Sequence, residues 1–323
     1  MNSSMFQNSI ESSLDRLDRL NLRYQRELVL KNKHYEDLVD RHYPHYKKFE
    51  LPLNYNLIYI HKQTSIEILN HIINVASDTY HFILDTQNEI DPYPWATKYT
   101  PSLLQIKFDS FKHSPLILFV EVSYLKSNFS TRTHDYTKQQ KIKQLFKNIF
   151  SSNKYIFAWG NVKEKLTPFY KFQLFTENDL NQLNTIDLHA HFREWYKLFF
   201  PSSLIAKVRS KNEPYSLQTA IFLVFDEWLN TRMQYASWNC GIDTNLKTYH
   251  CQFSSKIDND YYHFVRDEIN YRKEMEIYAI SNCFAIKKLM NLMLKQKPLS
   301  EKNILSSSKI IHYKRQKRPQ SLV

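Results

Sequence analysis

The chain has 323 residues, enough for one full-sized core with extensions or for two small domains. Its only glycines are Gly160 and Gly241, so it cannot form the glycine-rich phosphate loop of P-loop, kinase or Rossmann proteins, and these classes are excluded. The formal net charge of +12 favours a polyanionic partner, although the segment from Lys295 onward, with eight basic residues against one acid, carries +7 of it.

The first part of the chain, residues 1–50, is predicted to form an amphipathic helical extension. Within residues 9–40, apolar side chains at helical spacing follow one face and arginines follow another. The apolar positions are Ile10, Leu14, Leu17, Tyr24 and Leu28, and the arginines are Arg16, Arg19, Arg23 and Arg26. We expect this helix to pack on the main domain or on a protein partner, with an RNA-binding arm as the alternative.

After a break at residues 51–53, a helix is predicted at residues 65–75, followed by three strands in close order. The strands are expected at residues 80–85, 103–108 and 116–122. Their connections are too short to hold a crossover helix, so they predict an antiparallel meander.

Helix and strand then alternate. A helix is predicted at residues 138–150, a strand at 155–159 that ends at Gly160, and a weaker strand at 185–188. A strand, helix, strand order favours parallel addition to a sheet. The expected fold is therefore α/β, with a mixed five-stranded sheet, made of the meander plus parallel strands, flanked by helices.

The last third of the chain is predicted to be mainly helical from Phe192 onward. The best helix candidates are residues 215–229 and 265–294. Residues 298–323 contain a triple serine and a run of basic side chains, and should form a disordered basic tail.

The cysteine count and the hydropathy pattern bear on the compartment. Three cysteines with no C-x-x-C pair suit a reducing environment, and no apolar run approaches the length of a membrane span. We expect an intracellular protein without a membrane partner, cytoplasmic or nuclear, and the basic cluster at residues 314–318 could act as a nuclear localisation signal.

The most informative residue is Asp85, which ends the apolar run Phe-Ile-Leu-Asp at residues 82–85. A carboxylate at the end of a buried strand has lost hydration, so it needs a metal, a cation or a reaction to serve. Gln87 lies two residues later and points to the same face of an extended chain.

Asp85 also begins a series of motifs that resembles the DEDD-type 3′-5′ exonucleases of the ribonuclease H-like superfamily, in their Werner and Rrp-type branch. Residues 82–87 (FILDTQ) are similar to the first family motif, an apolar strand with Asp-x-Glu, and residues 101–106 (PSLLQI) to its Pro-x-Leu-x-Gln-Ile strand. Ser237 and Trp238 are similar to the Ser-x-Trp turn, and residues 278–282 (YAISN) to the Tyr-Ala-x-x-Asp motif on a helix.

The resemblance covers residues 57–294 and implies a ribonuclease H-like fold. It places an exonuclease-like domain at residues 51–297, with an unusual insertion at about 239–272.

The resemblance also implies a metal site. The family is expected to use two divalent ions, Mg²⁺ or Mn²⁺, held by four acids. The corresponding positions here are Asp85, Gln87, Asn161 and Asn282, so amides replace three acids, and Tyr278, which orients the water in the family, stands one helical turn before Asn282. Because an amide brings no negative charge, we expect the metal to be lost or weakly bound.

Four other acids are candidates to rescue metal binding at Asp85: Glu89, Asp91, Glu121 and Asp187. Asp187 and Glu121 are the best placed of these. The alternatives are a solvated loop for Glu89 and Asp91, and a pairing with lysine or arginine for Glu121 and Asp187.

Two further groups of metal-ligating residue types are weaker. Cys240, His250 and Cys251 have poor spacing and too few ligands for zinc. His189 and His191 alternate near a strand end, where histidines are more often surface or core groups than ligands.

Together these features predict a nucleic-acid-binding protein with a 3′-5′ exonuclease-like domain whose catalysis is impaired, and whose partner is the 3′ end of RNA or DNA. One alternative is an active 3′-5′ exonuclease with a non-standard ligand set. Another is a protein-interaction module on the same fold, with the N-terminal helix as its contact.

Overall fold

The structure is a computed structural model of the chain, and the residues it describes are 47–90, 99–109, 114–125, 133–200, 215–248 and 259–296. The predicted helix at residues 9–40 and the basic tail at 298–323 lie outside these ranges. So do three candidate ligands from the sequence, namely Asp91, His250 and Cys251.

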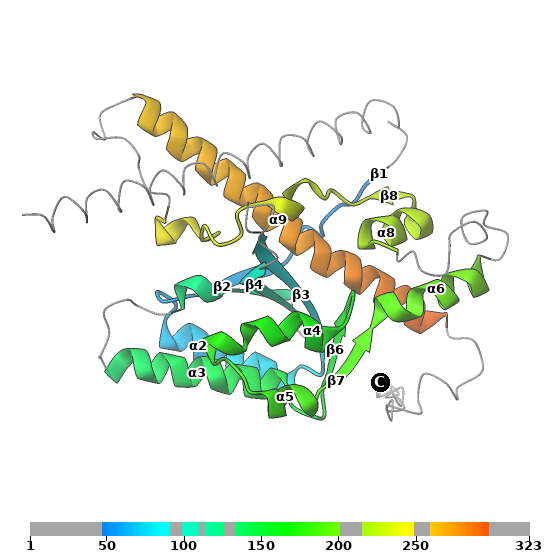
Figure 1. The fold of residues 1–323 in the computed structure, drawn as a ribbon, viewed down its shortest axis with the longest axis horizontal. Helices are drawn as coiled ribbons and strands as arrows, with labels where there is room; N and C mark the ends of the chain where they lie inside the picture. The colour runs from blue at the N-terminus through cyan, green and yellow to red at the C-terminus, as the bar shows by residue number, and fades with distance from the viewer. Residues whose placement is uncertain are drawn as a thin grey trace, which may run out of the picture.

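A six-stranded sheet forms the centre of the fold, with strand order β2-β5-β4-β3-β6-β7 (Figure 1). The strands are β2 (Asn56–Ile60), β3 (His81–Ile90), β4 (Tyr99–Phe108), β5 (Leu116–Glu121), β6 (Tyr155–Ala158) and β7 (Asn184–Asp187). Strand β4 is antiparallel to both β3 and β5, and the pairs β2 with β5, β3 with β6, and β6 with β7 are parallel. The meander followed by parallel strands on the β3 side is the ribonuclease H-like arrangement, so the predicted fold class is confirmed.

The sheet differs from the prediction in two respects. Strand β2 adds a sixth strand at the β5 edge, where the short run Asn-Leu-Ile-Tyr-Ile pairs in register with residues 116–120. Strand β3 continues past Asp85 to Ile90, because pairing with β4 persists through the polar residues after a bulge between Gln87 and Asn88. Asp85 therefore lies inside the strand, opposite Gln105, and not at its end.

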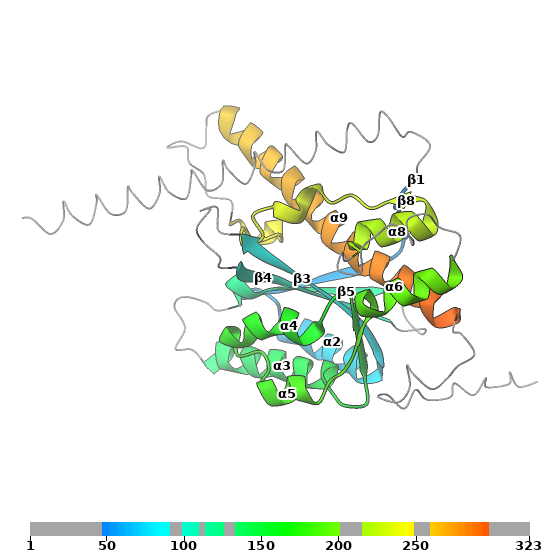
Figure 2. The ribbon, with the colours of Figure 1, turned by 45° about the vertical axis from the view of Figure 1, so that its right-hand side comes forward.

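Helices cover both faces of the sheet (Figures 1 and 2). One layer contains α2 (Ile66–Asp78), α3 (Thr133–Ile149), α4 (Val162–Leu166), the 3-10 helix η2 (Thr167–Phe172) and α5 (Glu177–Asn181). The other contains α6 (Leu188–Phe199), α8 (Leu217–Phe225) and the long α9 (Asn259–Lys295). Alternation along β3 assigns its side chains: Phe82 and Leu84 join the core under α2 and α3, whereas Ile83 joins the core under α6, α8 and α9. Asp85 and Gln87 share the parity of Ile83 and face α9.

The shorter elements complete the α9 side. A two-residue parallel ladder joins β1 (Lys47–Lys48) to β8 (Glu227–Trp228), and three 3-10 turns are η1 (Val122–Tyr124), η3 (Arg232–Tyr235) and η4 (Thr244–Leu246). The helix predicted at 215–229 is shorter than expected, because Asp226 adopts a left-handed conformation, φ 53°, and ends α8. The helix predicted at 265–294 lies within α9, which also contains the second part of the expected insertion.

None of the described helices combines the length and the apolar character that crossing a bilayer requires.

Candidate functional site

The candidate site is a single buried carboxylate between the sheet and α9. Asp85 is 7% exposed and has polar partners on both oxygens. Its Oδ1 accepts a hydrogen bond from Lys165 Nζ at 2.8 Å, and its Oδ2 accepts from Gln87 Nε2 at 3.3 Å and Asn282 Nδ2 at 3.2 Å. The structure thus brings Asp85, Gln87 and Asn282 together, and adds a lysine that forms an ion pair with Asp85.

Lys165 reaches Asp85 from helix α4, which begins directly after β6. Gly160, at φ +103°, makes the turn out of β6, and a Cβ added there would lie 3.4 Å from Lys165 Cε. A Cβ at that distance would be in ordinary contact, so it is the left-handed φ of Gly160 that requires glycine here. The side chain of Lys165 is 25% exposed and that of Asp85 is 10% exposed, so the lysine is the more accessible partner of the ion pair.

Asn161 lies beside this turn but uses its side chain to start α4. Its Oδ1 accepts hydrogen bonds from the backbone N–H groups of Lys163, at 2.9 Å, and Glu164, at 3.3 Å, and its Nδ2 donates to the Glu164 carboxylate at 3.0 Å. This is an N-cap, which satisfies backbone donors at the first turn of a helix. The structure places Asn161 as the residue that orients α4, and Lys165 as the member of this segment that contacts Asp85.

Tyr278 lies on α9 one turn before Asn282, as predicted. Its ring packs on Trp238, with ring centroids 5.7 Å apart, so the Ser-Trp turn and the α9 motif meet. Burial raises the pKa of the Tyr278 phenol well above its ordinary value; a hydrogen bond with Asn282 opposes that shift and the charge of Asp85 adds to it. The phenol is therefore a neutral hydrogen-bonding group near neutral pH.

Behind Asp85, on neighbouring elements, lie two buried polar side chains. Cys283 Sγ donates to Gln105 Oε1 at 3.8 Å, and Gln105 Nε2 is buried with no hydrogen-bond partner among the described residues. Burial, and then the Asp85 charge, raise the pKa of the Cys283 thiol, so it is not a thiolate nucleophile at neutral pH.

Two of the acids that could have rescued a metal site instead hold one segment of backbone. We call residues 237–248 the strap. Glu89 accepts from Ser237 Oγ at 3.4 Å and from Asn239 N–H at 3.2 Å. Glu121 Oε1 accepts from the N–H groups of Ile242 and of Asp243, the latter at 3.4 Å. These carboxylates therefore satisfy backbone N–H donors at positions of the strap that lie outside any helix or strand.

A histidine and an arginine hold the strap from other elements. His61 Nδ1 accepts the N–H of Gln63 at 3.1 Å, so its Nε2 carries the proton and donates to Asp243 Oδ2 at 2.7 Å. Burial acts to raise the pKa of Asp243, but hydrogen bonds from His61 and from a backbone N–H outweigh it and keep the pKa below its ordinary value. Arg272, 2% exposed on α9, donates to the carbonyl of Gly241.

Asp187 is likewise occupied by backbone donors. It is the N-cap of α6, where its Oδ1 accepts from the N–H groups of His189 at 2.9 Å and Ala190 at 3.2 Å, and it also accepts the N–H of Gly160 at 3.0 Å. The ring of His189 packs on Trp159, with centroids 5.2 Å apart. Asp187 therefore ties the β6 turn to the start of α6.

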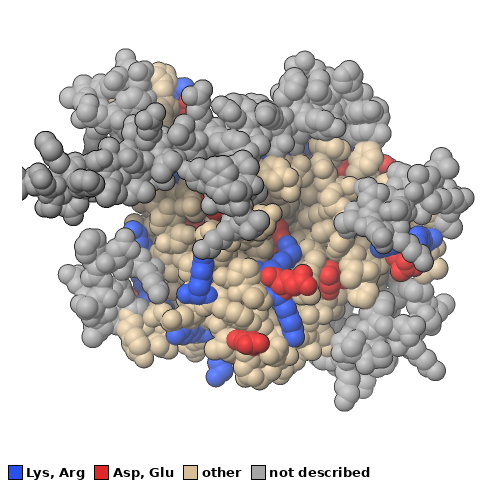
Figure 3. Space-filling model, viewed as in Figure 1, with Lys and Arg blue, Asp and Glu red and all other residues tan. Residues whose placement is uncertain are grey.

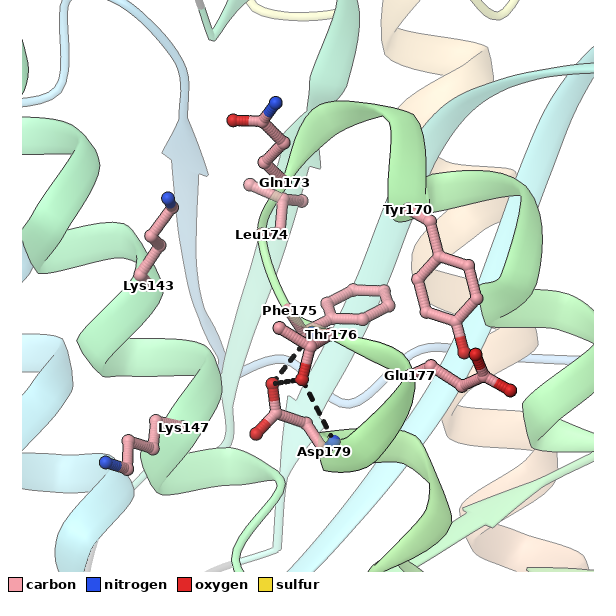
Figure 4. Close-up of a pocket in the computed structure, with 9 residues that line it drawn as sticks. All are labelled: Lys143, Lys147, Tyr170, Gln173, Leu174, Phe175, Thr176, Glu177 and Asp179. Atoms are coloured by element: carbon pink, nitrogen blue, oxygen red, sulfur yellow. Dashed lines mark hydrogen bonds between the residues drawn. The ribbon is translucent and has the colours of Figure 1, made fainter.

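A surface hollow of about 530 Å³ lies on the opposite side of the sheet from α9 (Figure 4). Lys143 and Lys147 of α3 form one wall, and Tyr170 and Glu177 lie on the other. The Asp179 carboxylate in this hollow is engaged in the capping box that starts α5. Its charges are mixed, and it shares no residue with the Asp85 site.

Similarity to known proteins is found among solved structures, at low sequence identity. No family model matches the chain, and no curated protein matches it. Similar solved structures include the EXO domain of Nibbler from Aedes aegypti, at 11% identity and a TM-score of 0.38, covering 74% of this chain and 89% of that one. RNase D from Trypanosoma brucei, in a complex with GMP, matches at 11% identity and a TM-score of 0.38, covering 75% of this chain and 64% of that one.

RNase D from Escherichia coli matches at 10% identity and a TM-score of 0.33, covering 76% of this chain and 51% of that one. The strand order and directions described above, rather than these scores, identify the fold as ribonuclease H-like.

The chemistry of the Asp85 site does not fit a pair of divalent cations. Hard cations need several anionic oxygens to offset their charge and the loss of their water. Here one carboxylate is already neutralised by an ammonium, and Gln87 and Asn282 turn amide N–H groups, which are donors, toward it. Among the described residues, no group of three or more His, Cys, Asp and Glu side chains is placed to hold a metal ion.

Lys165 is the site residue that the sequence did not reveal. It is one of 44 lysines and arginines, and nothing in its immediate sequence marks it. The sequence does contain one related signal. Asn161 followed three residues later by Glu164 is typical of a helix start, and the start of a helix fixes the direction in which the side chains of its next turn point.

Proposed function

We propose that this chain is a nucleic-acid-binding protein built on a 3′-5′ exonuclease-like domain in which metal-dependent cleavage has been lost. The observation that carries the proposal is the ion pair of Asp85 with Lys165, flanked by Gln87 and Asn282. Phosphodiester cleavage by two metals requires a strongly anionic pocket. A pocket with no net charge cannot supply it.

The loss of negative charge from the pocket also favours the binding of nucleic acid. A pocket of four carboxylates repels phosphate unless metals are present, whereas a neutral pocket with an ammonium at its mouth does not. The chain as a whole carries +12, which draws polyanions toward it. Figure 3 shows basic and acidic side chains interspersed over the described part of one face, so the support comes from the site and the net charge, not from a uniform basic patch.

The proposal is tested by incubating the purified chain with 5′-labelled single-stranded RNA and DNA in Mg²⁺ or Mn²⁺, beside an Asp85→Ala variant. We expect binding without shortening of the strand. Affinity should fall as salt rises, because phosphate contacts release counterions. The matched control is Glu194→Ala, which removes an exposed acid on α6.

Shortening of the strand that disappears in Asp85→Ala would instead establish an active exonuclease. Failure to bind either nucleic acid at low salt would contradict the proposal and leave a protein-interaction module. A truncation that removes residues 298–323 separates the contribution of the predicted tail, because affinity that vanishes with it would belong to the tail and not to the fold.

A further inference from the structure

Three acids near the candidate site already accept hydrogen bonds from other parts of the chain, and this determines which cation the site can hold. Glu89 and Glu121 bind the strap, and Asp187 binds the start of α6. Each of these carboxylates accepts two or more hydrogen bonds, and turning it toward a metal would leave those donors without partners. Of the candidate acids within the described ranges, Asp85 is therefore the carboxylate that remains for a cation.

The cation that pairs with Asp85 is the ammonium group of Lys165. Its Nζ lies 2.8 Å from Oδ1, the distance of a charge-assisted hydrogen bond. Three local features deliver it there: Asn161 fixes the first turn of α4, Gly160 turns the chain out of β6 at a left-handed φ of +103°, and Asp187 accepts the N–H of Gly160. The arrangement is built by the fold and is not a chance surface contact.

The ammonium also has capacity for a ligand. A lysine ammonium carries three N–H donors, and among the described residues one of them donates to Asp85. The side chain of Lys165 is 25% exposed while that of Asp85 is 10% exposed, so the lysine is the more accessible of the two to an incoming group. A phosphate oxygen is the ligand whose charge and acceptor geometry suit such a donor.

We propose that Lys165 is a tethered cation that takes the place of the divalent metal in this pocket, neutralising Asp85 and contacting a phosphate group of the bound nucleic acid. The contact with phosphate rests on the proposed function, whereas the replacement of the metal does not. Ligand binding at this site is therefore independent of divalent cations.

The binding test compares wild type, Lys165→Gln and Asp85→Asn by fluorescence anisotropy with labelled single-stranded RNA, in EDTA and in MnCl₂. Wild type should bind equally in both. Lys165→Gln should bind roughly tenfold or more weakly, the effect of one charge-assisted hydrogen bond. Asp85→Asn should bind as tightly as wild type or more tightly, because it removes the negative charge that competes with phosphate for the ammonium.

Two more variants serve as controls. Lys163→Gln removes an equal charge from an exposed position on the same helix, and we expect it to stay within about twofold of wild type. Lys165→Arg keeps the charge and should retain binding, which separates the cation from any loss of folding in Lys165→Gln. Binding that EDTA abolishes, or that Asp85→Asn weakens as much as Lys165→Gln does, would overturn the proposal, since both results are those of a metal-mediated contact.

A second readout needs no nucleic acid. The melting temperature of wild type should be the same in MnCl₂ and in EDTA, because a ligand stabilises only the state that binds it. A rise in Mn²⁺ that Asp85→Asn removes would show that the metal displaces Lys165, and would overturn the replacement even in a chain that binds RNA. Absence of RNA binding under all conditions would overturn the proposed function and the phosphate contact, while this readout would still decide the replacement.

Discussion

The ionisation of Glu121 gives a quantitative prediction. Burial raises the pKa of Glu121 from 4.5 to about 7; the Ile242 N–H, His61 and the Asp243 N–H act to lower it, and the Asp243 charge acts to raise it. One carboxylate oxygen, Oε2, is buried with no hydrogen-bond partner among the described residues, so the ionised form is poorly compensated. The folded protein therefore retains this proton to a higher pH than the unfolded chain does.

The sign follows from proton binding. Between about pH 4.5 and 7 the folded state holds the Glu121 proton and the unfolded state has lost it, so the free energy of unfolding falls as pH rises. Each pH unit costs about 1.4 kcal/mol, and the window therefore removes about 3 kcal/mol. The stabilisation from the Glu121 proton is fully present below about pH 4.5 and is lost above about pH 7.

Glu121→Gln isolates this effect, because the amide keeps an oxygen for the strap N–H groups and does not titrate. We expect the stability of the variant relative to wild type to increase by about 3 kcal/mol between about pH 4.5 and 8, as measured by urea unfolding at a series of pH values. Titrating groups far from Glu121 contribute equally to both proteins and cancel in the difference. The control Glu194→Gln removes a carboxylate from an exposed position on α6 and should change the free energy of unfolding by less than about 0.5 kcal/mol.

A difference between Glu121→Gln and wild type that stays constant with pH would refute the reasoning, because it would mean that Glu121 titrates alike in both states. A difference of opposite slope would show that the strap N–H groups outweigh burial and stabilise the carboxylate.

Three further substitutions test local features by thermal or urea unfolding. Asp187→Ala should cost about 1–2 kcal/mol, because α6 loses its N-cap, and Asp187→Asn should restore most of this; equal stability of the two variants would contradict the capping role. Gly241→Ala should cost about 1–3 kcal/mol, since φ is +82° and the new Cβ would lie 2.8 Å from a threonine hydroxyl; a neutral result would show that the strap relaxes. Lys154→Met should cost about 1–3 kcal/mol, because its buried ammonium donates to the carbonyl of Ala76 at the end of α2, whereas Lys147→Met, at an exposed position, should be nearly neutral.

The parts of the fold that sequence predicted are those encoded by local periodicity. The apolar runs of β4, β5 and β6 are buried on both faces, and short continuous apolar runs favour strands. The relation of Asp85 to Gln87, and of Tyr278 to Asn282, depends only on the period of a strand or a helix, and the structure has both pairs on a shared face.

The parts that sequence did not predict depend on contacts between distant segments. The continuation of β3 to Ile90 through polar residues requires β4 as a partner, and the strand propensities of those residues alone do not predict it. The same holds for the pairing of Lys165 with Asp85, and for the roles of Glu89 and Glu121 as acceptors for the strap. A buried acid predicts that it has some partner, but only the folded chain shows which one.

The position of α9 along the chain sets the order in which the site is assembled during synthesis. All six strands of the sheet and Lys165 precede α9, so Asp85 and Lys165 are synthesised before Asn282. Until α9 emerges, the face of the sheet that contains Ile83 has α6 and α8 but lacks the third helix that covers it. A nascent chain paused at this stage exposes apolar surface that the finished protein buries, and such surface promotes aggregation.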